Sequence, residues 1–206
     1  MLLAKPEFKF IRNGGCFLPS KLVTALRQAL LTVPEAAFVA GVSQRMVQHE
    51  IDERIVEAKE ALGRRSMLGI EVLYLNAIRP FHGGMAPKLR RQLRDAIVKS
   101  AAQNREVFQF EVFVVSLMAL EDEVRAEFDI LQRVKNELIQ KNPEILGGEP
   151  VISGTRIAVR LIAELIRKGA TSEELQSEFD LTSEQVSAAL LFDRVNPKRG
   201  RPRLMR

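Results

Sequence analysis

Residues 147–159 read GGEPVISGTRIAV, a glycine-rich loop followed by an apolar run, and a loop of this kind can hold a phosphate. A phosphate-binding loop has four residues between its two glycines and a Lys-Ser/Thr pair directly after the second. Here five residues separate Gly148 from Gly154, and Thr155-Arg156 stands where Lys-Ser/Thr is needed. Because no lysine is placed to reach a β- or γ-phosphate, we expect these glycines to form turns and not a nucleotide site.

Catalytic and metal-binding patterns are also weak in this chain. It has one cysteine, Cys16, and two histidines, His49 and His82, which lie in different segments. A single cysteine cannot form an intrachain disulfide, and this usage is typical of a reducing cytoplasm. No His/Cys cluster has the spacing of a metal site, and no carboxylate pair or catalytic triad stands out. We therefore predict no metal, no cofactor and no enzymatic activity.

The composition is that of a globular protein. Of the 206 residues, 46% are hydrophobic and 28% are charged. No apolar stretch approaches the roughly 20 residues of a membrane span, and charges interrupt the N-terminal stretch where a secretory signal would be apolar. We therefore expect a cytoplasmic protein that does not enter a membrane.

Charge is divided unevenly along the chain. Residues 1–105 carry 17 basic and 9 acidic side chains, whereas residues 106–193 carry 8 basic and 17 acidic ones. The last thirteen residues carry six basic side chains and no acidic one. Because a basic surface attracts the phosphate backbone and an acidic surface repels it, we expect nucleic acid to bind the front half or the tail. The acidic part is expected to bind a protein.

Residues 32–54 have the pattern of two short helices joined by a tight turn. Thr32 and Glu35 form a Thr-x-x-Glu capping box, Gly41 permits the turn, and Ser43 can cap the second helix. In a helix-turn-helix the second helix reads the major groove with its N-terminal residues. The predicted DNA-binding residues of this helix are Ser43, Gln44, Arg45 and Gln48. Acidic residues on its later turns restrict groove contact to its start: Glu50, Asp52 and Glu53. A short αα-corner in a helical core would have the same pattern.

A basic segment follows this motif. Gly63-Arg64-Arg65 lies between apolar stretches and predicts a hairpin or wing whose arginines, Arg64 and Arg65, contact phosphates. Residues 86–103 are expected to form a helix with a basic early portion that contains Lys88, Arg90, Arg91 and Arg94. These four residues are compatible with phosphate contact or with a solvated face.

The rest of the chain predicts a strand, a connector helix and a small helical unit. Residues 106–115 alternate as in a strand, and apolar residues from Leu117 to Leu138 recur every three or four positions, as in an amphipathic helix. Ile145-Leu146 and Val151-Ile152 are expected to pair as a small hairpin. Thr155 is expected to cap the first of three helices, which lie near residues 157–168, 172–178 and 183–194.

From residue 142 to residue 193 the chain resembles a small helical family whose members often stand beside a PIN-domain ribonuclease toxin. The Gly-x-Pro-x-x-x-Gly-Thr-Arg core of that family is matched by Gly148, Pro150, Gly154, Thr155 and Arg156. Placed behind a helix-turn-helix, this module looks like that of VapB-type antitoxins, and residues 32–54 are more distantly similar to the excisionase or MerR variety. The resemblance implies a homeodomain-like module and a toxin as partner.

The basic tail has three possible roles. Arg199-Gly200-Arg201-Pro202 matches the core of an AT-hook, which enters an A·T-rich minor groove. The resemblance implies instead that a tail arginine pairs with carboxylates in the active site of the toxin. The third possibility is nonspecific attraction to nucleic acid. The predicted toxin-binding residues are Arg156, Arg160, Arg194, Lys198, Arg199, Arg201 and Arg203.

Together these patterns predict a mainly α fold in four parts. These are an N-terminal (winged) helix-turn-helix DNA-binding domain with a basic extension at 1–105, a short strand plus connector helix at 106–141, a three-helix homeodomain-like domain with a small β-hairpin at 142–194, and a basic flexible tail at 195–206. The predicted function is an antitoxin that inhibits a PIN-domain ribonuclease toxin and represses its own operon as a homodimer on palindromic operator DNA. The alternative is a stand-alone DNA-binding transcriptional regulator with an AT-hook-like tail and no toxin.

Overall fold

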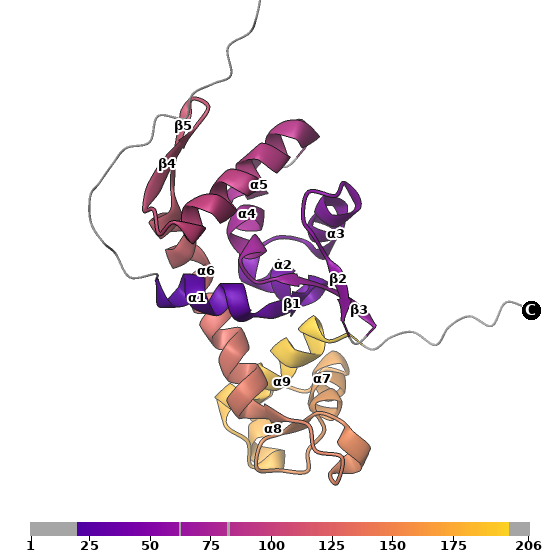
Figure 1. Cartoon of the computed structure of the whole chain (residues 1–206). Helices are drawn as coiled ribbons and strands as arrows, with labels where there is room; N and C mark the ends of the chain where they lie inside the picture. The colour runs from indigo at the N-terminus through magenta and orange to yellow at the C-terminus, as the bar shows by residue number, and fades with distance from the viewer. Residues whose placement is uncertain (1–19, 62, 82, 198–206) are drawn as a thin grey trace, which may run out of the picture. The chain divides into compact units, whose positions relative to one another are not determined.

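A computed structural model describes residues 20–61, 63–81 and 83–197 (Figure 1). Within these residues the protein is mainly helical, with one three-stranded and two two-stranded antiparallel sheets. The chain forms two compact units, residues 1–128 and residues 129–206. The tail residues Lys198, Arg199, Arg201 and Arg203 lie outside the described part, so the expectations for them concern the sequence alone.

The first unit contains a compact set of short helices and strands. In chain order they are α1 (Lys21–Gln28), β1 (Leu30–Thr32), α2 (Val33–Ala40), α3 (Gln44–Asp52), β2 (Lys59–Ala61), β3 (Arg64–Leu68), α4 (Glu71–Ile78), η1 (Arg79–Phe81), α5 (Pro87–Ala102), β4 (Val107–Phe110), β5 (Phe113–Ser116) and the first part of α6 (Leu117–Arg133). The three-stranded sheet has the order β1-β3-β2, so β3 is its central strand. The hairpin predicted around Gly63 is therefore present, as β2 and β3.

Local sequence signals explain why α2 and α3 begin and end where they do. The Glu35 carboxylate accepts hydrogen bonds from the Thr32 N–H (2.8 Å) and hydroxyl (3.0 Å), which confirms the predicted capping box. Gly41 ends α2 with a φ of 66°, a left-handed conformation that suits glycine. The Ser43 Oγ then accepts the Met46 N–H at 3.1 Å and starts α3. The two helices are thus joined by a turn of three residues.

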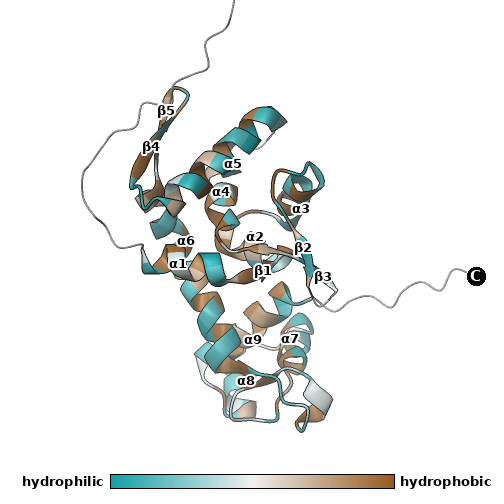
Figure 2. Ribbon diagram, in the orientation of Figure 1, coloured by the Kyte–Doolittle hydropathy of each residue, from teal (hydrophilic) through white to brown (hydrophobic). Residues whose placement is uncertain are grey.

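Helix α4 lies at the centre of this unit. It packs against α2 and α5, and its residues from Glu71 to Asn76 are all buried. Figure 2 shows α2 and α4 mainly in the brown of hydrophobic residues. A helix that is buried all round needs apolar residues on every side, which the stretch Val72–Leu75 supplies. The Asn76 amide donates to the Ala40 carbonyl at 3.4 Å and so satisfies the end of α2.

Residues 106–116 form a hairpin and not the single strand that the alternation predicts. Strands β4 and β5 pair in antiparallel register, with Phe110 opposite Phe113. Between them Glu111 has a φ of 51°, so the chain reverses there without a glycine or a proline to announce it. The sequence signal for this turn is therefore missing, and the prediction of one strand was wrong.

The second unit contains the end of α6, three further helices and a short sheet. The elements are the π-helical turn η2 (Val134–Leu138), β6 (Ile139–Gln140), the 3-10 turn η3 (Leu146–Gly148), β7 (Val151–Ile152), α7 (Val159–Arg167), α8 (Ser172–Phe179) and α9 (Ser183–Val195). The three helices agree with the predicted positions within two residues. Thr171 with Glu174 and Thr182 with Gln185 form the capping boxes that start α8 and α9.

Two details at the start of this unit differ from the prediction. Strand β7 pairs with β6, so Ile152 lies opposite Ile139 and not opposite Ile145. Buried Ile139 and Ile152 both belong to the core of the unit, which explains why they pair, whereas Leu146 is exposed in a 3-10 turn. Thr155 does not cap α7: its hydroxyl donates to the Ile152 carbonyl at 2.9 Å and accepts the Ile157 N–H at 3.1 Å.

Candidate nucleic-acid interface

Helix α3 has one buried face and one exposed face. Met46, Val47 and Glu50 are buried, whereas Gln44 and Arg45 at the start of the helix are exposed. Within the described part of the chain, neither of these two exposed side chains has a hydrogen-bond or ion-pair partner. The beginning of α3 therefore presents a guanidinium and an amide that are available to an external ligand.

The β2–β3 hairpin is joined to α3 through Asp52. The Asp52 carboxylate accepts hydrogen bonds from Gln48 Nε2 (3.2 Å) and from Arg65 Nη1 (2.9 Å). These bonds, first the one from Arg65, lower the pKa of Asp52 below its ordinary value. The predicted site residues Gln48 and Arg65 thus meet on one carboxylate, although 17 positions separate them in the chain. Because all three groups are on the surface, the bridge orients the side chains and adds little to stability.

The two arginines of β3 point to opposite sides of the sheet. Successive side chains alternate along a strand, so exposed Arg65 lies toward Asp52 and half-buried Arg64 lies on the other face. Arg64 is opposite Ala61 at the turn of the hairpin. The structure therefore brings Arg65 to the end of α3, where it meets Asp52, and it places Arg64 on the far face of the same hairpin.

Glu50 does not oppose groove contact from the surface of α3, contrary to the expectation from the sequence. Its side chain is fully buried and forms an ion pair with Arg90 of α5. The Tyr74 hydroxyl of α4 donates to the other Glu50 oxygen at 2.7 Å. Burial raises the pKa of the Tyr74 phenol, and the hydrogen bond to Glu50 raises it further. This network links α3, α4 and α5 and fixes which face of α3 is exposed.

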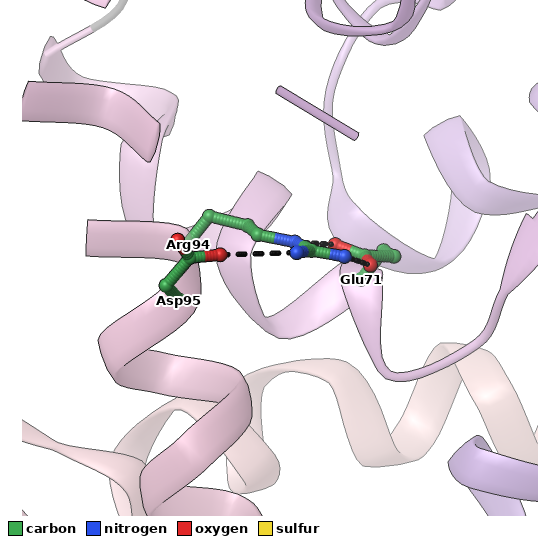
Figure 3. A network of polar contacts seen from close by, with 3 residues as sticks. All are labelled: Glu71, Arg94 and Asp95. Carbon is green, nitrogen blue, oxygen red and sulfur yellow. Dashed lines mark hydrogen bonds and ion pairs between the residues drawn. The ribbon is translucent and has the colours of Figure 1, made fainter. Parts of the chain in front are cut away.

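Two of the four basic residues predicted at the start of α5 are withdrawn from the surface. Arg90 is 5% exposed, and Arg94 forms a paired contact with the Glu71 carboxylate, one bond of which joins Nε to Oε2 at 3.0 Å (Figure 3). Arg94 Nη1 also contacts Asp95 at 3.0 Å. The hydrogen bond to Glu71 raises the pKa of Arg94, and burial raises the pKa of Glu71 against the opposing effect of Arg94. The prediction that these two arginines lie on a solvated or phosphate-binding face was wrong.

The other two basic residues predicted at the start of α5 remain exposed. Lys88 lies in the first turn, and Arg91 donates to the Glu53 carbonyl at the end of α3 at 3.2 Å. Their separation from Arg90 follows the helical period, because Arg90, Leu93, Ile97 and Ala101 share the buried side of α5.

In the second unit the predicted partner-binding arginines lie at two places. Arg156 is exposed in the loop before α7, and Arg160 is half-buried in its first turn. Arg194 is exposed in the last turn of α9.

Among the described residues no group of three or more His, Cys, Asp or Glu side chains is placed to hold a metal ion. Likewise, none of the described helices has the length and apolar character needed to cross a membrane.

Comparisons with known proteins match one domain of this chain to a family model and most of the chain to a relative. Residues 139–192 match the model of a protein family of unknown function, DUF433. The "Uncharacterized protein y4eO" of Sinorhizobium fredii is 30% identical over 196 residues, which cover 85% of each chain. The crystal structure of Rv2018 from Mycobacterium tuberculosis is 16% identical and covers 78% of this chain and 96% of its own, with a TM-score of 0.33. A TM-score of 0.33 is too low to show a common fold. The identity to y4eO over most of both chains is sufficient, and the protein belongs to the same family as y4eO, with a DUF433 domain at residues 139–192.

Proposed function

We propose that this protein is a DNA-binding antitoxin, in which the first unit binds operator DNA and the second unit with the tail binds a PIN-domain ribonuclease toxin. In this proposal α2 and α3 are a helix-turn-helix, and β2 and β3 are its wing. The observation that carries the DNA-binding part is the capped start of α3, where Gln44 and Arg45 are exposed.

The chemistry of these side chains suits base recognition in the major groove. An arginine can donate two hydrogen bonds to the O6 and N7 atoms of guanine, and a glutamine can bind the N6 and N7 positions of adenine. A recognition helix uses its N-terminal residues for this purpose, and that is where Gln44 and Arg45 lie. We propose that Arg45 is the main base-reading residue because it is exposed and has no partner within the described part of the chain.

The wing supplies the contacts to the phosphate backbone in this proposal. Arg65 is held at the edge of α3 by Asp52, and Lys59 is exposed on the neighbouring strand. Phosphate contacts of this kind fix the position of a protein on the duplex, and they make binding sensitive to salt. Asp52 then acts as the residue that orients Arg65 and Gln48 before DNA arrives.

Toxin binding is proposed for the second unit on grounds of charge. Residues 142–193 carry four basic and nine acidic side chains, which disfavours contact with DNA and favours a protein partner. Within this acidic unit Arg156, Arg160 and Arg194 are the described cations that we assign to the toxin interface. The second candidate is a stand-alone DNA-binding regulator without a toxin. A first unit that binds DNA supports this function and the antitoxin function equally.

A binding assay and a growth assay test the two parts separately. In the first, fluorescence anisotropy with the DNA upstream of the coding region should give a salt-sensitive complex, and an equal affinity for unrelated duplexes would contradict operator recognition. In the second, cells that express the adjacent reading frame alone should stop growing and recover when this chain is supplied. Recovery without residues 194–206 would show that the tail is not the inhibitor. Absence of any growth defect would favour the stand-alone regulator.

A further inference from the structure

The β4–β5 hairpin exposes apolar side chains at its turn. Val112 is 87% exposed and Val114 is 68% exposed, and Phe113 between them is half exposed. Figure 1 shows the hairpin extending from the unit with its turn directed away from the helices. A two-stranded hairpin has little stability of its own, and exposed apolar residues on such a ribbon favour association. This arrangement therefore favours contact with a partner surface.

A cavity of about 280 Å³ lies beside this hairpin within the first unit. Its walls come from α4, α5, α6, the loop after η1 and the inner side of the hairpin, and they include Ala77, Met85, Leu93, Phe110, Phe113 and Leu120. Ser116 is its one polar lining residue, and its Oγ is already used as acceptor by the Ala119 N–H at 3.2 Å. Phe81 and Phe113 border it with their ring centroids 6.0 Å apart. A cavity with such walls accepts an apolar group and no charged one.

The chain thus carries an apolar projection and an apolar hollow on neighbouring parts of one surface. Such a pair is what a two-fold interface needs, because the same patch must complement itself across the axis. Strands β4 and β5 pair only with each other among the described residues, so the outer edge of each strand has backbone groups open to pairing with another strand. No Lys, Arg, Asp or Glu lines the cavity, so a second copy meets no unpaired charge there.

We propose that a second copy of this chain docks on this hairpin surface, with Val112 of each copy entering the cavity of the other. The surface is defined by Phe81, Val112, Phe113, Val114 and the cavity walls. This surface would be the interface of the homodimer expected on palindromic operator DNA. Only the link to that two-fold operator rests on the proposed function. Association is measured without DNA, so failure of DNA binding and failure of this interface are distinguishable.

The first test measures the mass of the full chain in solution by sedimentation velocity. We expect a dimer for the natural sequence and a monomer, or association weakened at least tenfold, for Val112→Glu and for Val114→Glu. The matched control is Leu161→Glu, which places the same charge on an exposed apolar position of α7, and it should remain dimeric. Circular dichroism of each variant checks that it is folded. A monomeric natural chain, or dimers that both hairpin variants preserve, would overturn the proposal.

A cross-linking test then examines the exchange of Val112. In a Cys16→Ser background, one chain carries Val112→Cys and a second chain of different length carries Met85→Cys, since Met85 lines the cavity. Mild oxidation of the mixture should give a disulfide-linked pair of unequal chains, because the two sulfur atoms meet only across the interface. Leu161→Cys in place of Val112→Cys should give none. A dimer whose mixed chains do not cross-link would overturn the proposal, as would a small apolar compound that occupies the cavity without affecting association.

Discussion

Glu50, on the buried side of α3, forms an ion pair with Arg90 of α5, and both side chains are buried. The pair joins the helix proposed to read DNA to the helix behind it. Tyr74 holds the second Glu50 oxygen, so both carboxylate oxygens have a partner. Because a helix that is fixed in this way cannot rotate, the same three residues determine that Gln44 and Arg45 face outward.

Removing the charge of Glu50 should therefore destabilise the first unit strongly. Glu50→Gln leaves the Arg90 guanidinium buried without its counter-ion, and we expect a loss of about 3–5 kcal/mol in the free energy of unfolding. Tyr74 is the single tyrosine of a chain without tryptophan, so its fluorescence during urea denaturation reports on this unit. Glu53→Gln, an exposed neighbour, should change the value by less than about 0.5 kcal/mol. Equal effects of the two variants would show that the buried pair is unimportant.

Substitution of Arg45 should affect sequence preference more than general attraction to DNA. We expect Arg45→Ala to weaken binding to the preferred duplex by roughly 5- to 150-fold, which corresponds to the loss of one bidentate base contact. The same variant should bind unrelated duplexes almost unchanged. Arg27→Ala, which removes an equally exposed cation from α1, is the matched control and should retain the preference. Competition binding at fixed salt separates these outcomes, and equal losses on all duplexes would refute base reading by Arg45.

Sequence alone predicted the parts of this site that depend on neighbours in the chain. The cap at Ser43, the left-handed Gly41 and the capping box of Thr32 with Glu35 each involve residues within four positions, and all are confirmed. The Glu50–Arg90 pair spans 40 positions, and no local pattern shows that these two residues meet. One signal was available, since Glu50 follows Met46 by four positions and so shares the apolar side of α3.

Strand pairing was less predictable for the same reason. Ile145-Leu146 and Ile139-Gln140 are both acceptable partners for β7 by composition, and only the packing of Ile139 into the core of the second unit selects between them. The turn at Glu111 carries no glycine, proline or asparagine, so nothing in the sequence marked it. Both errors concern choices that tertiary contacts decide, whereas α3, α8 and α9 begin at caps in their own sequence.

The pKa of Asp52 gives a direct measure of the bridge between α3 and the hairpin. Hydrogen bonds from Arg65 and Gln48 depress this pKa, so the bridge is intact above the ordinary carboxyl value of 3.8 and is lost as the pH falls through the depressed value. We expect Arg65→Ala to raise the Asp52 pKa toward 3.8, as followed by the carboxyl carbon signal in NMR. Arg45→Ala, which does not touch Asp52, should leave it unchanged. An Asp52 pKa that is insensitive to Arg65 would remove the bridge from the site.

Gly69 lies where β3 leads into α4, and its Cα faces the end of α1 so closely that a side chain has no room. A Cβ built there would stand 2.7 Å from the Leu26 carbonyl oxygen and 3.2 Å from the Ala29 Cβ. The Gly69 N–H also donates to the Ala29 carbonyl at 2.9 Å. Gly69→Ala must therefore push α1 away from the strand, and overpacking of this kind costs about 1–3 kcal/mol. Gly84→Ala makes the same chemical change where the nearest atom is 3.7 Å away, an ordinary contact, and should have little effect. Urea denaturation followed by Tyr74 fluorescence compares the two variants, and a Gly69→Ala protein as stable as Gly84→Ala would mean that α1 does not pack against this strand.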